Sequence, residues 1–379
     1  MIYIFVTTFL IALVIAWVSI PTIIKVAQQK HLYDEPDESR KSHTSKIPTL
    51  GGISIFAGAV ISATFFAHES KNLDLGAFLS AMTILFFTGI KDDIIPLPPY
   101  KKFLAQLLAT LIIVLWGDVR LSSLYGFFFT YKAPDWFLIL ATIFTIIVII
   151  NAFNLIDGIN GLAGGVACIV LITFGAWFYL YNEESLAIWA VATCGATIGF
   201  LRYNLLQGKI FMGDTGSLIL GFVTAVFAIK FIEMNGSEKS FIGIKAPIFA
   251  IAVLAIPLFD TIRVFVVRTL NRRSPFSGDR NHLHHLLLDS GFSHLQASFV
   301  LYALNIFVIF VAYLSKNLNA YIYMGILWVI MLSFTQTFLI IRKRRRKTLE
   351  KKQLEKKQIP LTSPISKLPY ELSSSYEKI

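Results

Sequence analysis

Five short polar stretches interrupt an otherwise apolar chain, and they carry the residue types that phosphate and metal chemistry requires. Ionisable groups near hydrocarbon are costly and are usually functional. Carboxylate and amide oxygens can hold Mg2+, and basic side chains can bind phosphate oxygens. Together they predict phosphoryl transfer, in which positioning and charge neutralisation supply the catalysis. The stretches are Asp92 with Asp93, NAFNLIDGINGLAGG at 151–165, NLLQGKIFMGDTGS at 204–217, Asp260 with Arg263, and DRNHLHHLLLD at 279–289.

The stretch at 151–165 spaces three polar residues evenly before a break in the chain. Asn151, Asn154 and Asp157 recur every three residues, which places them on one side of a helix end. The following DG and NG pairs then end the helix. Their oxygens could hold Mg2+ or bind a sugar hydroxyl. The alternative is a polar helix end that is capped by turn residues.

Two further acids have a structural explanation beside a functional one. Asp214 precedes the apolar run LILGFVTAVFAI, where a helix would start. A helix N-terminus suits a phosphate group, and an aspartate there suits a cation that bridges to phosphate. An ordinary N-cap explains Asp214 as well. Asp260 and Arg263 are three residues apart, which also fits an ion pair within one helix.

The histidine cluster HLHH comprises His282, His284 and His285. A zinc site is not favoured, because the chain has no HExxH motif and no cysteine partner for these residues, and His282 and His284 would diverge on a helix. With Arg280 and two other nearby arginines, the cluster is more typical of a phosphate-binding loop. The alternative is a set of surface histidines in a basic loop.

Composition shows which elements must position these groups. The chain has 379 residues, of which 55% are hydrophobic and 15% are charged, and its mean hydropathy is +0.67. These values indicate an all-α integral membrane protein with several spanning helices. A spanning helix needs about 20 mostly apolar residues. Eleven segments qualify approximately: 2–24, 49–67, 75–90, 103–117, 136–153, 162–181, 185–201, 214–231, 246–267, 297–315 and 319–341.

Lysine and arginine positions predict the orientation of these eleven segments. With the N-terminus outside, the inward loops hold more than twice as many basic residues as the outward loops, which favours a cytoplasmic C-terminus. The first segment has no cleavage site and is expected to remain as an anchor. Every polar stretch then falls on the inner side, which predicts one active site on the cytoplasmic face.

The basic run that begins at Arg342 divides the chain into a polytopic transmembrane catalytic domain, 1–341, and a basic cytoplasmic tail, 342–379. We expect this run to be a stop-transfer signal with a solvated, partly helical tail; the alternatives are anionic lipid or nucleic-acid binding.

A transporter of an anionic solute is the alternative from another class of protein. Such a protein would also carry intramembrane acids and basic loops, but its polar groups would lie near the middle of the helices. Here the acids and histidines lie at the ends of the expected helices, and the chain shows no internal repeat. It also has no Walker loop, kinase signature or Rossmann glycine pattern, so a familiar ATP-binding module is not expected.

Several motifs, in order, resemble the bacterial polyprenyl-phosphate N-acetylhexosamine-1-phosphate transferases. They are RKSHTSKIPTLGG at 40–52, KDD at 91–93, NAFNLIDGINGLAGG at 151–165, FMGDTGSLILG at 211–221, PLFDTIRV at 257–264 and HLHH at 282–285. The resemblance spans about residues 1–340. It implies transfer of a sugar 1-phosphate from a UDP-sugar to undecaprenyl phosphate, with release of UMP. It further implies a requirement for Mg2+ or Mn2+, a multi-pass protein of the bacterial cytoplasmic membrane, a possible homodimer and no nucleic-acid partner.

The same resemblance implies roles for individual residues. Asp214 would be a metal ligand, with Asn154 as a possible second one, and Phe211 would stack on uracil. Asp92 and Asp93 would act on the lipid phosphate, and Asp157 joins them as a catalytic candidate. Direct attack and a covalent enzyme intermediate both remain open. Substrate contacts are expected from Asn151, Asn160, Asn204, Arg280, His282, His284 and His285.

Two sequence details bear on the substrate. Many members of the family carry DGxDG where this chain has Asn160 in place of the second acid, which weakens any mechanism that needs a carboxylate there. The HLHH form and the RKSHTSKIP loop resemble the WecA and TagO branch, which uses UDP-GlcNAc. They are less similar to the MraY branch, which uses UDP-MurNAc-pentapeptide. We therefore expect GlcNAc-1-phosphate transfer for a surface polysaccharide such as O-antigen, teichoic acid or capsule.

Overall fold

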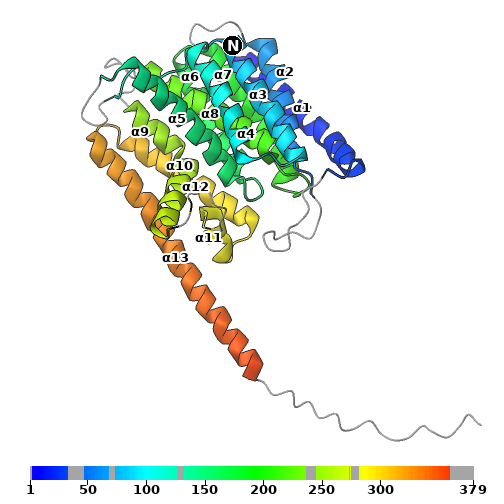
Figure 1. Cartoon of the computed structure of the whole chain (residues 1–379), viewed down its shortest axis with the longest axis vertical. Coiled ribbons are helices and arrows are strands. Elements are labelled where there is room, and N and C mark those ends of the chain that lie inside the picture. The colour runs from blue at the N-terminus through cyan, green and yellow to red at the C-terminus, as the bar shows by residue number, and fades with distance from the viewer. Residues whose placement is uncertain are drawn as a thin grey trace, which may run out of the picture.

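The computed structural model describes residues 2–32, 47–67, 73–125, 132–235, 245–272, 274 and 281–358. These residues form an all-α bundle, as the sequence predicts (Figure 1). Its helices are α1 (Ile2–Gln29), α2 (Gly51–Phe66), α3 (Leu75–Ile94), α4 (Pro99–Leu115), α5 (Asp135–Ile156), α6 (Leu162–Leu180), α7 (Glu184–Asn204), α8 (Gly213–Asn235), α9 (Ala246–Val253), α10 (Ala255–Leu270), α11 (Leu283–Asp289), α12 (His294–Leu314) and α13 (Ala320–Gln358).

Eight of these helices are long and apolar enough to cross a membrane, so the chain is a multi-pass membrane protein. They are α1, α3, α5, α6, α7, α8, α12 and α13. The pair α9 and α10 is bent by 83° and would make a ninth span if it crosses as one unit. Each of the eleven expected segments overlaps a helix or this pair, but α2 and α4 have only 16 and 17 residues. Eleven crossings therefore remain a prediction.

Helix α8 forms the centre of the bundle. Its apolar window is completely buried, and α2, α3, α5, α6 and α9 all contact it. A helix that is apolar on all sides is expected to lie in the interior. Asp214 lies in the first turn of α8, so the position of α8 in the bundle places Asp214 among the ends of the surrounding helices.

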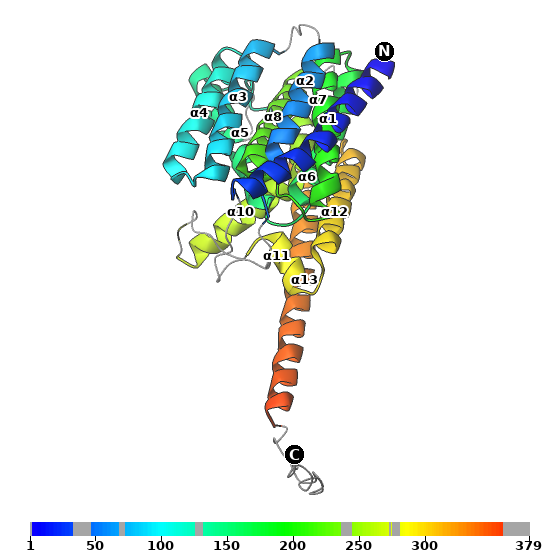
Figure 2. The same ribbon diagram turned by 90° about the vertical axis from the view of Figure 1, so that its right-hand side faces the viewer.

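Helix α13 extends far beyond the bundle. The N-terminus of the chain lies at the opposite end of the molecule from this extension (Figure 2). The short helix α11 lies beside α13 just outside the bundle, and the two are in contact. Helix α13 continues through the expected domain boundary at 341 as far as Gln358, and residues 359–379 of the expected tail lie outside the described residues.

Candidate active site

A lysine joins two of the candidate acids at one end of the bundle. The Nζ atom of Lys102, in α4, lies 2.7 Å from Oδ2 of Asp92, near the end of α3. The same ammonium pairs with Oδ2 of Asp214, in the first turn of α8. The amide of Asn154, from the last turn of α5, donates to Oδ1 of Asp214 at 2.6 Å and contacts Oγ of Ser217 at 2.9 Å. Four helix ends thus bring Asp92, Asp214 and Asn154 together.

Lys102 is not among the site residues expected from sequence. It is one of two adjacent lysines in the first turn of α4, and only the tertiary structure distinguishes it from Lys101, which is exposed. A signal was available, because a lysine at a helix start follows the acidic pair after a short proline-rich turn. Its charge offsets the repulsion between the carboxylates of Asp92 and Asp214.

Asp93 caps the helix that carries Asp214. Its carboxylate accepts hydrogen bonds from the backbone N–H groups of Asp214, at 2.7 Å, and Thr215, at 3.0 Å. It also accepts one from the Thr215 hydroxyl at 2.5 Å. A carboxylate at a helix N-terminus satisfies unpaired N–H groups and interacts favourably with the helix dipole. Asp93 therefore fixes the start of α8, and the catalytic role expected for it remains a prediction.

The turn before α8 is held by backbone pairing with the start of α2 and the residues just before it. The N–H of Phe211 donates to Pro48 O at 2.8 Å, and the carbonyls of Phe211 and Met212 accept from Gly51 and Gly52 at 3.0 and 2.9 Å. A Cβ atom on Gly52 would lie 2.1 Å from the backbone nitrogen of Gly216. The IPTLGG segment at 47–52 therefore positions Phe211, the expected uracil-stacking residue, whereas residues 40–46 of the RKSHTSKIPTLGG motif lie outside the described residues.

A second close backbone approach joins α3 to α8 at Gly89. A Cβ atom on Gly89 would lie 2.3 Å from Cα of Thr215, so the two helices could not both keep their positions. We expect Gly89→Ala to lower the free energy of unfolding by about 1–3 kcal/mol, a typical cost of overpacking. Thermal unfolding in detergent measures this change. Gly325→Ala is the matched control, because a Cβ atom there would have nothing within 4 Å; equal effects of both variants would contradict the account.

Asn204 and Asn160 lie where two loops meet. Asn204 is buried and connects the loops, since its Oδ1 accepts from Gly161 N at 2.6 Å and its Nδ2 donates to Ile210 O at 2.8 Å. Gly161 has φ +80°, a left-handed conformation that favours glycine. Within the described residues, the buried Oδ1 atom of Asn160 has no hydrogen-bond partner. Asn204 thus shapes the loop. The substrate contacts expected for Asn160 and Asn204 remain predictions.

Asp157 follows the last residue of α5 and lies close to the acid cluster. Burial, together with the negative charges of Asp214 and Asp93, raises the pKa of Asp157 well above its ordinary value. A carboxyl group of this kind can hold a proton near neutral pH, which is a property of general acids and bases.

Asn151, one helical turn before Asn154, pairs with a neighbouring amide. Its Nδ2 donates to Oε1 of the buried Gln106 at 2.8 Å and to the carbonyl of Ile147 at 2.8 Å. This pair joins α4 to α5. The substrate contact expected for Asn151 remains a prediction, whereas its packing role is evident.

The histidine helix α11 is anchored to α10 by one buried carboxylate. Asp260 Oδ1 accepts from Leu283 N at 2.9 Å and from Arg263 at 3.0 Å, and its Oδ2 lies 2.9 Å from Nδ1 of His282. Arg263 also donates to the carbonyl of Asn281. The alternative of an ion pair within one helix is therefore correct for Asp260 and Arg263, and the pair additionally holds the start of α11.

His284 links α11 to the loop that carries Asp157. Its ring lies nearly parallel to that of His282, with centroids 5.6 Å apart, and a Cβ atom on Gly158 would lie 2.4 Å from its Nε2. Burial, with a smaller contribution from His285, lowers the pKa of His284 to about 3. His284 is therefore neutral at physiological pH and can bind substrate by hydrogen bonds rather than by charge. Its buried Nδ1 has no hydrogen-bond partner among the described residues.

Of the two remaining residues of the cluster, the structure describes His285 but not Arg280. His285 lies beside His284, with ring centroids 4.2 Å apart. Arg280 lies outside the described residues. Across the described part of the chain, no three His, Cys, Asp or Glu side chains are grouped as ligands of one metal ion.

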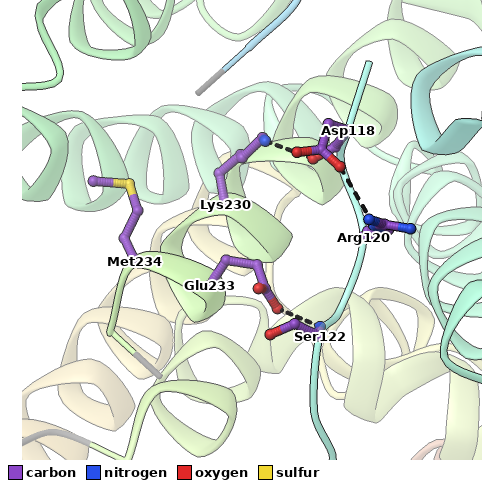
Figure 3. A pocket seen from close by; sticks show the side chains of 6 residues that line it. All are labelled: Asp118, Arg120, Ser122, Lys230, Glu233 and Met234. Atoms are coloured by element: carbon purple, nitrogen blue, oxygen red, sulfur yellow. Dashed lines mark hydrogen bonds and ion pairs between the residues drawn. The ribbon is translucent and has the colours of Figure 1, made fainter. Parts of the chain in front are cut away.

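A second polar cluster lies near the other end of α8. Lys230 donates to the carbonyl of Asp118 at 2.7 Å, and Glu233 accepts from Ser122 N at 2.8 Å. These residues line a cavity of about 330 Å3 together with Arg120 (Figure 3). Their hydrogen bonds attach the segment after α4 to the end of α8, which assigns them a structural role.

Comparison with known proteins identifies the family of the chain. Residues 75–232, from the start of α3 nearly to the end of α8, match the model of glycosyl transferase family 4. The chain is 33% identical over 290 residues to the undecaprenyl-phosphate alpha-N-acetylglucosaminyl 1-phosphate transferase of Escherichia coli O157:H7, covering 74% of this chain and 75% of that protein. It is 30% identical over 332 residues to the probable undecaprenyl-phosphate N-acetylglucosaminyl 1-phosphate transferase of Bacillus subtilis strain 168, covering 86% and 89%. The chain belongs to glycosyl transferase family 4.

Proposed function

We propose that this protein transfers GlcNAc-1-phosphate from UDP-GlcNAc to undecaprenyl phosphate, giving undecaprenyl-diphosphate-GlcNAc and UMP. The observation that carries this proposal is the meeting of Asp92, Lys102, Asn154 and Asp214 at one end of a membrane bundle. A lipid phosphate and a soluble nucleotide can both reach such a position. Relatives that act on undecaprenyl phosphate support the choice of lipid and sugar.

We further propose that Asp214 and Asp92 hold Mg2+ or Mn2+ together with diphosphate oxygens of the donor. Two carboxylates are a suitable protein contribution, because Mg2+ is often bound by one or two carboxylates plus substrate phosphates. Bound there, the cation would neutralise charge on the diphosphate. Asn154, expected as a ligand, donates to Asp214 in this structure and thus orients its carboxylate.

The chain's own residues would divide the remaining work. Asp93 keeps α8 and Asp214 in place through its three hydrogen bonds. Asp157, whose pKa is raised, would hold a proton and donate it to a phosphate oxygen. Neutral His284, with the other residues of α11, would bind the donor's diphosphate or sugar, and Phe211 would stack on the uracil.

The proposal also includes a location and an orientation. We place the protein in the bacterial cytoplasmic membrane with the N-terminus outside and the active site inside. Residues 1–341 would form the catalytic domain, and 342–379 would extend into the cytoplasm. Support comes from the positive-inside pattern of the loops and from the opposite positions of the N-terminus and the α13 extension (Figure 2).

UMP release by the purified protein in detergent tests this function. The assay contains undecaprenyl phosphate, Mg2+ and either UDP-GlcNAc or UDP-MurNAc-pentapeptide. We expect release with UDP-GlcNAc that requires both lipid and metal. Release only with the pentapeptide donor would assign the protein to the other branch. Uptake of an anionic solute into vesicles without UMP release would support a transporter instead.

Replacing Lys102 is expected to strengthen the response to metal. In the structure its ammonium pairs with both carboxylates that would bind the cation. The ammonium competes with the cation for these carboxylates. A partly exposed ion pair contributes about 1 kcal/mol, so its removal should change the equilibrium constant for cation binding by about fivefold. We therefore expect Lys102→Gln to lower the Mg2+ concentration that gives half-maximal UMP release by about this factor. Lys101→Gln is the control; an increase in the required Mg2+ with Lys102→Gln would show that the lysine supports metal binding.

A further inference from the structure

Helix α13 contacts the C-terminal end of the histidine helix through three arginines. The guanidinium of Arg342 lies 2.7 Å from Oδ2 of Asp289, the last residue of α11, and that of Arg346 lies 3.8 Å from the same oxygen. Nη1 of Arg345 donates to the carbonyls of Leu288 and Asp289 at 3.4 and 3.3 Å. These contacts place positive charge where the last carbonyls of α11 leave partial negative charge.

Apolar packing accompanies these polar contacts. The rings of Phe292 and Phe338 meet edge to face, with centroids 5.6 Å apart, and Ser290 Oγ lies 3.3 Å from the carbonyl of Phe338. A Cβ atom on Gly291, which has φ +109°, would lie 2.6 Å from Nη1 of Arg345. The turn after α11 is therefore fitted against α13.

The histidine helix is consequently held at both ends. At its start, Asp260 accepts a hydrogen bond from Leu283 N and contacts His282. At its end, the arginines of α13 bind Asp289 and the neighbouring carbonyls. A helix of seven residues is too short to be stable by itself, so its position depends on such contacts.

We infer that Arg342 and Arg345 are positioning residues, which hold the histidine helix in the place required to bind the UDP-sugar. This inference rests on the proposed function, because it assumes that the residues of α11 contact the donor. The arginines themselves do not touch substrate in this account. They act through α11, and Asp289 is their acceptor.

Helical periodicity separates these arginines from their basic neighbours. Arg342, Arg345 and Arg346 recur at three- and four-residue spacing, so they share one face of α13. Lys343 and Lys347 lie on other faces and are exposed, and neither makes an ion pair or a side-chain hydrogen bond within the described residues. The whole run is expected to be a stop-transfer signal, and Arg342 and Arg345 have this additional task.

The test compares two double variants that remove the same charge from the same run. Arg342→Gln with Arg345→Gln removes the contacts to α11, whereas Lys343→Gln with Lys347→Gln leaves them. Hydrogen exchange of the amides at 283–291 in detergent gives a readout that is independent of activity. We expect faster exchange, by about fivefold, in the arginine variant only, because exposed or partly exposed pairs are worth about 1 kcal/mol. Equal exchange in both variants would overturn the inference.

Steady-state kinetics then test the positioning role. We expect the arginine variant to raise KM for UDP-GlcNAc by about fivefold with a smaller change in kcat, and the lysine variant to leave both unchanged. In a variant that carries Arg342→Asp, adding Asp289→Arg restores an ion pair of reversed direction, and we expect it to lower KM for UDP-GlcNAc relative to Arg342→Asp alone. Faster exchange without a rise in KM would refute the positioning of the donor site. Absence of UMP release from the unmodified protein would instead refute the proposed function, and the exchange result would still decide whether α13 holds α11.

Discussion

Replacing Asp214 with alanine is expected to reduce UMP release by about 10³-fold or more while the protein stays folded. The Asp214 carboxylate lies where α3, α4, α5 and α8 meet, and Lys102 and Asn154 both bind it. Removal of one preorganised electrostatic contact commonly costs about 10²–10³-fold in rate. Under the proposed function this carboxylate also holds the cation that neutralises the diphosphate, so its removal should cost at least as much. UMP release over a Mg2+ titration measures the effect.

Two further measurements make the Asp214 result specific. Asp135→Ala removes an exposed acid from the N-terminal end of α5 and should retain activity. Thermal unfolding should show little change for Asp214→Ala, because Asp93 and not Asp214 caps α8. Activity within tenfold of the unmodified protein, with an unchanged response to Mg2+, would exclude Asp214 as the metal ligand.

Replacing Asp93 with asparagine should reduce both activity and stability. The carboxylate accepts three hydrogen bonds from Asp214 and Thr215, and an amide would present an NH2 group to one of these donors. Hydrogen bonds to charged groups contribute about 1.5–3 kcal/mol each, so we expect the free energy of unfolding to fall by about 2–3 kcal/mol. Because α8 carries Asp214, we expect activity to fall by about 10²-fold or more.

The pair of measurements separates two roles for Asp93. A pure general base would lose about 10²–10⁴-fold in activity with no loss of stability. A residue that caps α8 loses both together, and this is the outcome that the structure favours. A change in activity below about threefold would remove Asp93 from the mechanism altogether.

The apolar segments and their polar ends were predictable from sequence. Segment length and hydropathy are local properties, so the helices, the class of protein and the convergence of the acids at one end followed from them. The motif resemblance then indicated the family and the reaction. The 83° bend between α9 and α10 was not predicted, because residues 246–259, on both sides of the bend, form a continuous apolar run.

Tertiary partners could not be predicted, because they join residues far apart in the chain. Lys102 is 112 positions from Asp214, and nothing in its local pattern separates it from Lys101. Sequence also does not distinguish an amide that binds substrate from one that fixes a loop. The structure shows that the two polar atoms of Asn204 bond Gly161 and Ile210, and the substrate contact expected for Asn204 stays a prediction.

The arginines of α13 show the same limit. As a run of like charges they indicate a membrane boundary, and their contacts with Asp289 become evident only when α13 and α11 lie side by side (Figure 1).

The central claim is that the donor loses a sugar phosphate and not merely a sugar. The fate of the phosphorus next to GlcNAc tests it most directly, using UDP-GlcNAc labelled with radioactive phosphorus at that position, together with undecaprenyl phosphate and Mg2+. We predict that the label enters the lipid product and that the released nucleotide is unlabelled UMP. Label that leaves in UDP, with unlabelled GlcNAc on the lipid, would contradict the account and show transfer of the sugar alone.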